Sequence, residues 1–393
     1  VMRPIVMEAV VAPYFQPIVS LQTTQVIGFE VLGRMLKDGR EESLGPFFQN
    51  PDVSDDTRLE LDRLLRERAI RSIPQLDADQ RLFINLKPSW IYSEYKASGK
   101  LTTLEMLRRH EVDPQRVVIE VTEEAFSGDL CELVDIVKLY KEAGCAIAVD
   151  DVGSGFSSFE RIALIQPDIL KIDLNLLKKS AHHAGFQALL RSFSILSSQM
   201  GASLLAEGVE TREDLYNAMQ MGARYLQGYL FSKAKPEFPS KNTYSAMLRE
   251  ALSRFSSEKF GKFQQLMALE EQFDHLFSRD LTLEDPERAD WLIENVIKMV
   301  DDNCIRMYIC QEDGVQVSSN YSRAAGQPWR RERNYRGSNW AWRPYFVSNI
   351  VIMKKRGKGI LSSEYTDLDS PCLIQTYSFP LGNGFYFFMD LMV

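Results

Sequence analysis

Short apolar runs alternate with amphipathic stretches along the first 240 residues of the chain. Several of these runs have the length and composition of a buried parallel strand. They are Val26–Phe29, Leu82–Ile84, Val117–Ile119, Ala146–Val149, Ile169–Leu170 and Ser203–Ala206. A polar residue follows each run directly, in the order Glu30, Asn85, Glu120, Asp150, Lys171 and Glu207. A polar residue in this position suits a functional site better than a core.

Stretches with helical periodicity separate the apolar runs. Examples are Thr57–Ser72, Leu130–Ala143, Phe186–Met200 and Glu213–Met221, and glycine directly follows the last three. Glycine after the last turn is a common helix stop. This βα alternation predicts an α/β fold with a parallel sheet, and its length suits a modified TIM-like (β/α) barrel. Because the carboxyl ends of barrel strands converge on one face, the polar residues should meet there.

The pattern changes after residue 240. Residues 241–300 carry no strand signal and predict one long helix to about Arg279, then a second helix over Glu287–Val300. Such a segment is a connector or a dimer-forming helix. We therefore expect a barrel over residues 1–240, a helical linker over 241–300 and an α+β domain over 301–393.

The last segment is rich in strand signals. A turn at Glu312-Asp313-Gly314 predicts a hairpin between two strands. The expected strands of the segment are Ile305–Ile309, Val315–Ser318, Gly359–Ser362, Leu373–Phe379 and Gly384–Leu391.

Net charge and cysteine content indicate which binding partners and which cellular location suit the chain. A net charge of −8 and a pI near 5.3 argue against binding to DNA or to an anionic membrane surface. The five cysteines form no CxxC pair, which favours reduced thiols and a cytoplasmic location. No apolar run approaches the roughly 18 residues that span a bilayer, and the start of the chain lacks the pattern of a signal peptide.

Adjacent carboxylates at Asp150 and Asp151 lead into a turn rich in glycine and serine that extends to Ser158. Neighbouring carboxylates repel each other and are stabilised by cations. Asp150 could bridge two metal ions while Asp151 binds one. The alternative is an ordinary turn closed by an Asp side chain, an interpretation that weakens beside the other acids at strand ends.

The remaining polar residues at strand ends offer oxygen ligands and one lysine. Oxygen ligands favour Mg²⁺ or Mn²⁺, and Ca²⁺ could occupy the same site. Two such ions suit displacement at phosphorus, because they activate water and stabilise the attacking and leaving oxygens. Lys171 could orient the water or neutralise phosphoryl oxygens, and the alternative is a lysine that extends to solvent.

These residues lie in stretches that resemble the EAL-domain family of cyclic-di-GMP phosphodiesterases, which have a modified β/α barrel. The resemblance covers about residues 10–240. The matching stretches are Glu30-Val31-Leu32-Gly33-Arg34, Asn85, Glu120-Val121-Thr122-Glu123, residues 150–158, Leu170-Lys171-Ile172-Asp173, residues 206–211 and Gln227-Gly228-Tyr229. Val31, Val152, Ser154 and Phe156 depart mildly from the family pattern, as does Lys87, but no proposed metal ligand is lost.

The resemblance implies a function and a role for each matching residue. The reaction is hydrolysis of cyclic-di-GMP to linear pGpG with two Mg²⁺ or Mn²⁺ ions, and Ca²⁺ binds but inhibits. The implied metal ligands are Glu30, Asn85, Glu120, Asp150, Asp151 and Glu207. The implied catalytic residues are Lys171, Glu207, Asp150 and Glu123, of which Glu123 orders the loop over 150–158. The implied dinucleotide contacts are Gln16, Glu30, Leu32, Arg34, Asn85, Asp173 and Gln227.

Two alternatives stay open at this point. One is a cyclic-di-GMP receptor that binds with little turnover and signals through the C-terminal domain. The other is a phosphodiesterase for a different nucleotide, since metal ions contact phosphate rather than base. Family members commonly dimerise through the barrel, so a homodimer is expected.

The C-terminal segment is similar to the PAS-like or Cache-like sensor domain of some EAL proteins of the Bacillus type. The resemblance rests on residues 342–346, the basic stretch 354–359 and residues 362–365. It implies a small regulatory ligand near Arg343 and Tyr345. The alternative is a structural β-domain with an aromatic core.

Overall fold

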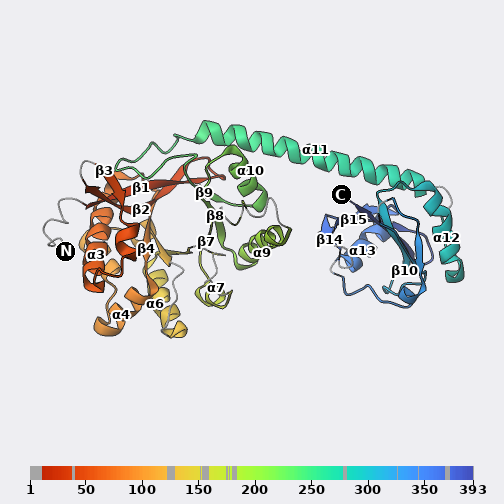
Figure 1. The fold of residues 1–393 in the computed structure, drawn as a ribbon, viewed down its shortest axis with the longest axis horizontal. Coiled ribbons are helices and arrows are strands. Elements are labelled where there is room, and N and C mark those ends of the chain that lie inside the picture. The colour runs from red at the N-terminus through yellow and green to blue at the C-terminus, as the bar shows by residue number, and fades with distance from the viewer. Residues whose placement is uncertain are drawn as a thin grey trace. The chain divides into compact units, whose positions relative to one another are not determined.

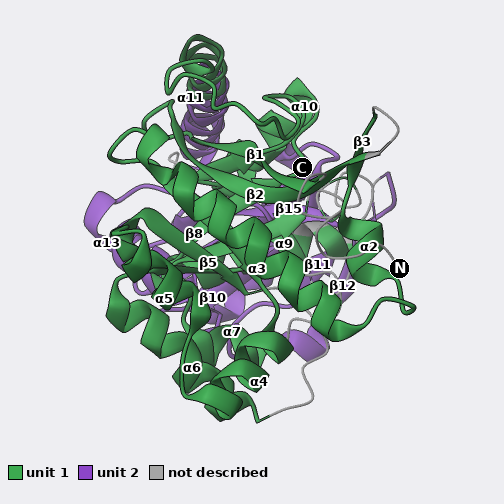
Figure 2. Cartoon of the chain, turned by 90° about the vertical axis from the view of Figure 1, so that its left-hand side faces the viewer, with its two compact units in different colours: residues 1–256 green, residues 257–393 purple. Residues whose placement is uncertain are grey.

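The computed structural model contains two compact units, residues 1–256 and 257–393 (Figure 2). It describes the chain apart from residues 1–10, 38–39, 122–128, 151, 153–158, 174–175, 177, 179–183, 278–280, 325, 344, 368–371 and 393. Among the described residues, no helix has the length and apolar character needed to cross a membrane.

Eight strands of the first unit close into a barrel (Figure 1). They are β1 Val11–Ser20, β2 Val26–Lys37, β4 Arg81–Leu86, β5 Val117–Val121, β6 Ala146–Val149, β7 Ile169–Asp173, β8 Ser203–Glu207 and β9 Tyr225–Gln227. The strands from β2 through β9 pair in parallel. The first strand, β1, closes the ring by pairing antiparallel with both β2 and β9. This reversed strand is what distinguishes the fold from a regular TIM barrel, in which all eight strands are parallel.

Strand β2 is longer than the sequence pattern predicts. It continues to Lys37 and pairs antiparallel with the outer strand β3, Arg40–Ser43. The expectation that Glu30 follows the end of its strand is therefore wrong. Glu30 instead lies where the parallel pairing of β2 with β4 stops, opposite Phe83.

Helices surround the barrel strands (Figure 1). They are α2 Gly45–Gln49, α3 Asp55–Ser72, α4 Pro88–Ser98, α5 Thr102–Arg109, α6 Leu130–Ala143, α7 Phe159–Ile165, α9 Ala184–Met200 and α10 Arg212–Met221, with 3-10 turns at Ile73–Gln75 and Pro114–Arg116. Local sequence explains their ends. The Asp129 side chain caps α6 by accepting hydrogen bonds from two backbone N–H groups, and Gly144 ends it with φ of +107°. A capping box between Thr211 and Asp214 begins α10.

The barrel interior has an apolar layer and a polar layer. The buried apolar layer contains Ile18, Phe83, Val118, Ala148, Ile169 and Leu205. Two residues further along each parallel strand, side chains return to the same face of the sheet. These positions hold Asn85, Glu120, Asp150, Lys171 and Glu207, and on the reversed strand β1 the corresponding residue is Gln16. The polar layer is thus a consequence of strand periodicity.

Helix α11, Ser245–Phe277, contributes residues to both units. Leu248, in its first turn, is completely buried and belongs to the main hydrophobic core of the first unit. The long helix expected in this segment is present and is described to Phe277, whereas its predicted end near Arg279 lies outside the described residues. The second predicted helix is present as α12, Ala289–Val296, flanked by 3-10 turns at Pro286–Arg288 and Ile297–Met299.

The second unit contains an antiparallel sheet in the order β12-β11-β10-β16-β15-β13, with β14 beside β15. The strands are β10 Cys304–Gln311, β11 Asn320–Ser322, β12 Arg330–Glu332, β13 Ile360–Leu361, β14 Tyr365–Thr366, β15 Leu373–Pro380 and β16 Phe385–Met392. A 3-10 turn spans Arg333–Tyr335, and helix α13 spans Phe346–Arg356. All described pairings of this sheet are antiparallel.

Two features of this unit differ from the sequence expectation. The turn at Gly314 forms, but residues 315–318 make isolated bridges rather than a strand, because β11 and β16 are the strands that pair with β10. The sequence does not predict helix α13, because this segment is rich in β-branched residues that favour strands. Its buried residues Phe346, Ile350 and Met353 recur at helical spacing and pack on the sheet.

Candidate metal centre

A buried lysine lies at the centre of the polar layer. The Nζ atom of Lys171 is 2.8 Å from Glu120 Oε1 and 2.8 Å from Glu207 Oε1. It is 3.2 Å from Asp150 Oδ1 and 3.6 Å from Glu30 Oε2. Lys171 and Glu120 are fully buried. Strands β2, β5, β7 and β8, with the residue after β6, therefore bring four carboxylates around one ammonium group.

This cluster has more negative than positive groups. Burial raises the pKa of Glu120 well above its ordinary value, and the neighbouring carboxylates of Glu30 and Asp150 raise it further. Burial also raises the pKa of Glu207. Burial alone would lower the pKa of Lys171, but the surrounding carboxylates raise it well above its ordinary value. Additional positive charge would stabilise the ionised carboxylates.

The donor set fits hard divalent cations. Both carboxylate oxygens of Glu120 are buried and accept no well-oriented hydrogen bond within the described part of the chain, although Lys171 forms an ion pair with one of them. Among the described residues, no three acidic, histidine or cysteine side chains meet the geometry of a metal site as they stand. The carboxylates instead contact the Lys171 ammonium. Their all-oxygen chemistry is that of Mg²⁺, Mn²⁺ and Ca²⁺ ligands.

Amide side chains fix the orientation of Glu30. Asn85 Nδ2 donates to Glu30 Oε1 at 2.8 Å, and Gln227 Nε2 donates to Glu30 Oε2 at 2.5 Å. Gln227 also donates to Gln16 Oε1 at 3.2 Å, and Gln16 donates to the Ser232 carbonyl at 3.2 Å. Residues from β1, β2, β4 and β9 thus form one hydrogen-bonded network at the edge of the carboxylate cluster.

Of the remaining site residues predicted from the sequence, the structure describes Leu32, Arg34 and Asp173. Leu32 and Arg34 line a cavity together with Asn85. Asp173 is the last residue of β7 and is half-buried. Asp151 and Glu123 lie outside the described residues.

The two residues expected to bind a regulatory ligand contact aromatic rings. The guanidinium of Arg343 lies 4.6 Å from the ring centroid of Trp342 and 5.7 Å from that of Trp340. The ring centroid of Tyr345 is 5.6 Å from that of Tyr365, and burial raises the pKa of Tyr345. These contacts are aromatic packing, and the regulatory role of the pair stays a prediction.

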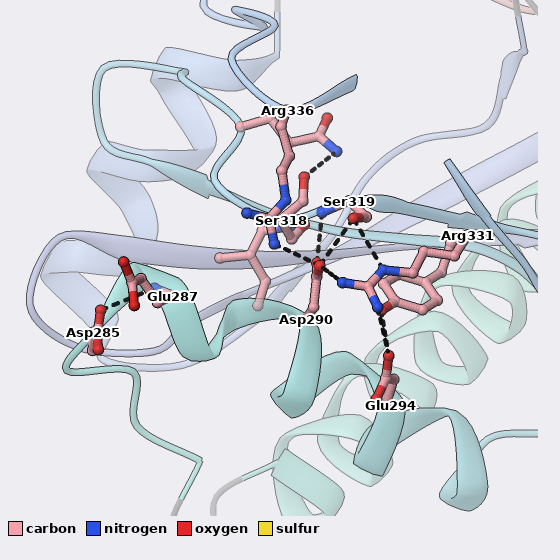
Figure 3. A network of polar contacts seen from close by, with 11 residues as sticks. Asp285, Glu287, Asp290, Glu294, Ser318, Ser319, Arg331 and Arg336 are labelled. Atoms are coloured by element: carbon pink, nitrogen blue, oxygen red, sulfur yellow. Dashed lines mark hydrogen bonds and ion pairs between the residues drawn. The ribbon is translucent and has the colours of Figure 1, made fainter. Parts of the chain in front are cut away.

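Sequence reasoning missed a buried polar network in the second unit (Figure 3). Asp290, in the first turn of α12, accepts from the Ser319 backbone N–H at 2.6 Å and from the Ser319 hydroxyl at 2.9 Å. Arg331 and Arg336 also donate to it. Burial would raise the pKa of Asp290, but these bonds lower it below its ordinary value. Ser319 directly precedes β11, Arg331 lies on β12 and Arg336 directly follows the 3-10 turn after β12, so the network fixes α12 to this edge of the sheet.

A second network joins residues of β10, β15 and β16 to Asp367, which directly follows β14. Arg306 donates two hydrogen bonds of 2.8 Å to Asp367 and one of 3.1 Å to Asp390. Thr376 donates to Asp390 at 2.7 Å. No sequence signal distinguishes these acids from surface acids, because their partners are distant along the chain.

The sequence and the fold match a known class of protein. The EAL domain family matches residues 8–234, and a family described as an EAL-domain associated signalling protein domain matches residues 238–393. The chain therefore belongs to the EAL-domain family. The expected fold, a modified TIM-like barrel followed by a helical segment and an α+β domain, is confirmed.

Among its relatives is YkuI of Bacillus subtilis, an uncharacterized EAL-domain containing protein. The two are 33% identical over 387 residues, which cover 97% of this chain and 94% of YkuI. The crystal structure of YkuI in complex with its substrate c-di-GMP and calcium matches with a TM-score of 0.91 at 32% identity, covering 100% of both chains.

Other relatives share only the barrel region. The cyclic di-GMP phosphodiesterase RocR of Pseudomonas aeruginosa is 30% identical over 233 residues, 57% of each chain. A standalone EAL protein of Vibrio cholerae in its c-di-GMP bound form is 30% identical, with a TM-score of 0.53, over 60% of this chain and 97% of that one.

Proposed function

We propose that this protein hydrolyses cyclic-di-GMP to linear pGpG, by attack of water on one phosphodiester bond. The observation that carries the proposal is the cluster of Glu30, Glu120, Asp150 and Glu207 around the buried Lys171. Supporting it, RocR is a cyclic di-GMP phosphodiesterase, and the YkuI and Vibrio cholerae structures contain c-di-GMP.

The cluster would hold two divalent cations, Mg²⁺ or Mn²⁺, and Ca²⁺ would bind without supporting turnover. The proposed ligands are Glu30, Asn85, Glu120, Asp150, Asp151 and Glu207. Asp150 would contribute to both ions. When bound, the cations would lower the pKa of water and neutralise charge on the phosphoryl oxygens.

Neighbouring residues position the cluster and the dinucleotide. Asn85 and Gln227 hold the Glu30 carboxylate from both sides through hydrogen bonds. Lys171 supplies a buried positive charge, which can orient the attacking water. The proposed contacts to the dinucleotide are Gln16, Leu32, Arg34 and Asp173. Glu123 would order the loop over residues 150–158.

A turnover assay on the purified full chain tests the proposal. Cyclic-di-GMP is incubated with Mn²⁺, Mg²⁺, Ca²⁺ or a chelator, and the products are separated by chromatography. We expect pGpG with Mn²⁺ or Mg²⁺ and none with Ca²⁺ or chelator. Calorimetric binding of cyclic-di-GMP with no product under any of these conditions would contradict the enzyme and support the receptor alternative.

A further inference from the structure

Helix α13 carries apolar side chains on more than one face. Phe346, Ile350 and Met353 are buried against the sheet, whereas Val347 and Val351 are 58% and 60% exposed. A helix at the surface of a globular protein normally has one apolar face toward the core and a polar face toward solvent. Exposed apolar side chains that lie together mark contact surfaces. The outer face of α13 is therefore a candidate contact surface.

An exposed tryptophan lies at the start of this helix. Trp342 is 63% exposed, and the guanidinium of Arg343 lies 4.6 Å from its ring centroid. The turn that contains Trp342 leads directly into α13, because the Phe346 N–H donates to the Arg343 carbonyl at 3.0 Å. Tryptophan is enriched at membrane–water interfaces, since its ring is largely apolar and its N–H can donate a hydrogen bond. Trp342 adds such a ring to the apolar end of α13.

Positive charge follows the apolar face along the helix. Val347, Val351 and Lys355 succeed one another at four-residue intervals, so they lie in one row on the helix surface. The last turn, Lys354–Arg356, is entirely basic and exposed, and an exposed Lys358 follows the end of the helix. The outer face thus changes from apolar to cationic within three turns.

Most of this charge is not neutralised by acidic side chains. Lys354 forms an ion pair with Glu312, and both side chains are half exposed. In the part of the chain that the structure describes, no acidic side chain forms an ion pair with Lys355, Arg356 or Lys358. The helix dipole also favours cations in a last turn. That effect gives no reason for exposed valines before the turn or for a lysine beyond it.

An anionic membrane surface has complementary properties. Its headgroups carry negative charge, and its interface takes up tryptophan and other apolar side chains. Clusters of about four or more basic residues on an amphipathic helix are typical of binding to anionic lipids. A nucleic acid would match the positive charge but not the valines. An apolar protein surface would match the valines but not the charge.

The negative net charge of the chain does not oppose this contact. The value of −8 sums charges over all residues. Salt screens charges that lie more than about 8 Å from the membrane at physiological ionic strength. A membrane beside α13 therefore interacts with the local cations rather than with acids elsewhere. The expectation drawn from net charge applies to the average surface of the chain and not to this face.

We propose that the outer face of α13 docks the second unit on an anionic membrane surface. Trp342, Val347 and Val351 enter the headgroup region, while Lys355 and the neighbouring cations contact lipid phosphates. The helix lies on the bilayer and does not cross it. The contact would concentrate the protein at the membrane. It is independent of the proposed hydrolysis, because docking requires no turnover.

Sedimentation of the full chain with lipid vesicles tests the proposal. The vesicles contain phosphatidylcholine alone or phosphatidylcholine with phosphatidylglycerol. We expect binding only with phosphatidylglycerol, and weaker binding as the salt concentration increases. Lys355→Gln should weaken binding about fivefold, the loss expected for one cation at an anionic surface. Lys138→Gln is the matched control, because it removes an exposed lysine from α6, and it should bind like the wild type.

Tryptophan fluorescence measures insertion independently of charge. Emission should shift to shorter wavelength when vesicles with phosphatidylglycerol are added, and Trp342→Phe should remove the shift. Trp291→Phe is the matched control and should retain it. Trp291 is 55% exposed and has the guanidinium of Arg288 4.8 Å from its ring centroid, but its neighbours on α12 include Glu294 rather than a basic cluster.

The apolar part of the contact is tested by Trp342→Ser. This variant should weaken vesicle binding about tenfold, because it removes a large apolar side chain. Trp291→Ser should have no effect. All variants change exposed side chains, and thermal unfolding curves that match the wild type establish that lost binding is not lost folding.

Several results would overturn the proposal. These are no binding to either kind of vesicle, equal binding to both, or equal losses in the patch variants and their controls. Vesicle binding without an emission shift would show attraction by charge alone and would contradict docking of the apolar face. Binding to duplex DNA without binding to vesicles, or self-association that Val351→Asp removes, would assign the face to another partner.

Discussion

Replacing Lys171 with methionine should destabilise the barrel strongly. Methionine has a similar length and no charge, so the change leaves four carboxylates without their shared ammonium. Two of these, on Glu120 and Glu207, lie 2.8 Å from the Lys171 Nζ atom, and Glu120 and Lys171 are completely buried.

The size of the effect follows from this burial. Removing one member of a buried ion pair typically costs about 3–5 kcal/mol, because the remaining charge is left without compensation. For a unit of this size, each kcal/mol lost from the free energy of unfolding lowers the melting temperature by about 2–4 °C. We therefore expect the barrel to melt about 6–20 °C lower than in the wild type, in metal-free buffer.

Hydrogen exchange measured by mass spectrometry reports the stability of the barrel separately from that of the second unit. Peptides that cover β5 and β7 should exchange faster in Lys171→Met, whereas peptides from β15 and β16 should not change. Lys138→Met is the control, since its partner Asp135 is exposed and such pairs are worth about 0–1 kcal/mol. Mn²⁺ should stabilise the Lys171 variant more than the wild type, because cation binding stabilises the folded state by mass action. An effect on the barrel no larger than that of the control would refute the role of Lys171 as counter-ion.

Three further predictions follow from other parts of the molecule. Asp150→Asn should lower kcat for cyclic-di-GMP at least about 100-fold, the scale of losing one strong electrostatic group, and near-normal turnover would contradict a shared metal ligand. Asp290→Asn should destabilise the second unit by about 2–3 kcal/mol at neutral pH, measured by urea unfolding. Because the pKa of Asp290 is lowered, its contribution is present above its ordinary pKa of 3.8 and is lost as the pH falls through the folded-state pKa, so the difference between wild type and variant should shrink in acid. A fragment ending at residue 256 should melt higher than one ending at residue 240, because only the longer one buries Leu248 of α11, and equal melting temperatures would contradict this.

The sequence alone determined the barrel and the members of its polar layer. Strand periodicity places every second side chain on one face, so a polar residue after an apolar run marks a position inside the barrel near its carboxyl end. This reasoning selected Asn85, Glu120, Asp150, Lys171 and Glu207. It also located the helix ends at Gly144 and Gly222, because local backbone preferences act within a few residues.

Tertiary structure decided the features that depend on distant residues. The polar network of Asp290 and the cavity lined by Leu32 and Asn85 each join segments far apart in the chain, and no local pattern marks them. Helix α13 forms from residues that favour strands because burial of one face on the sheet outweighs intrinsic propensity. Sequence periodicity reports which face of an element is buried, whereas the partners that cover this face are chosen only when the whole chain packs.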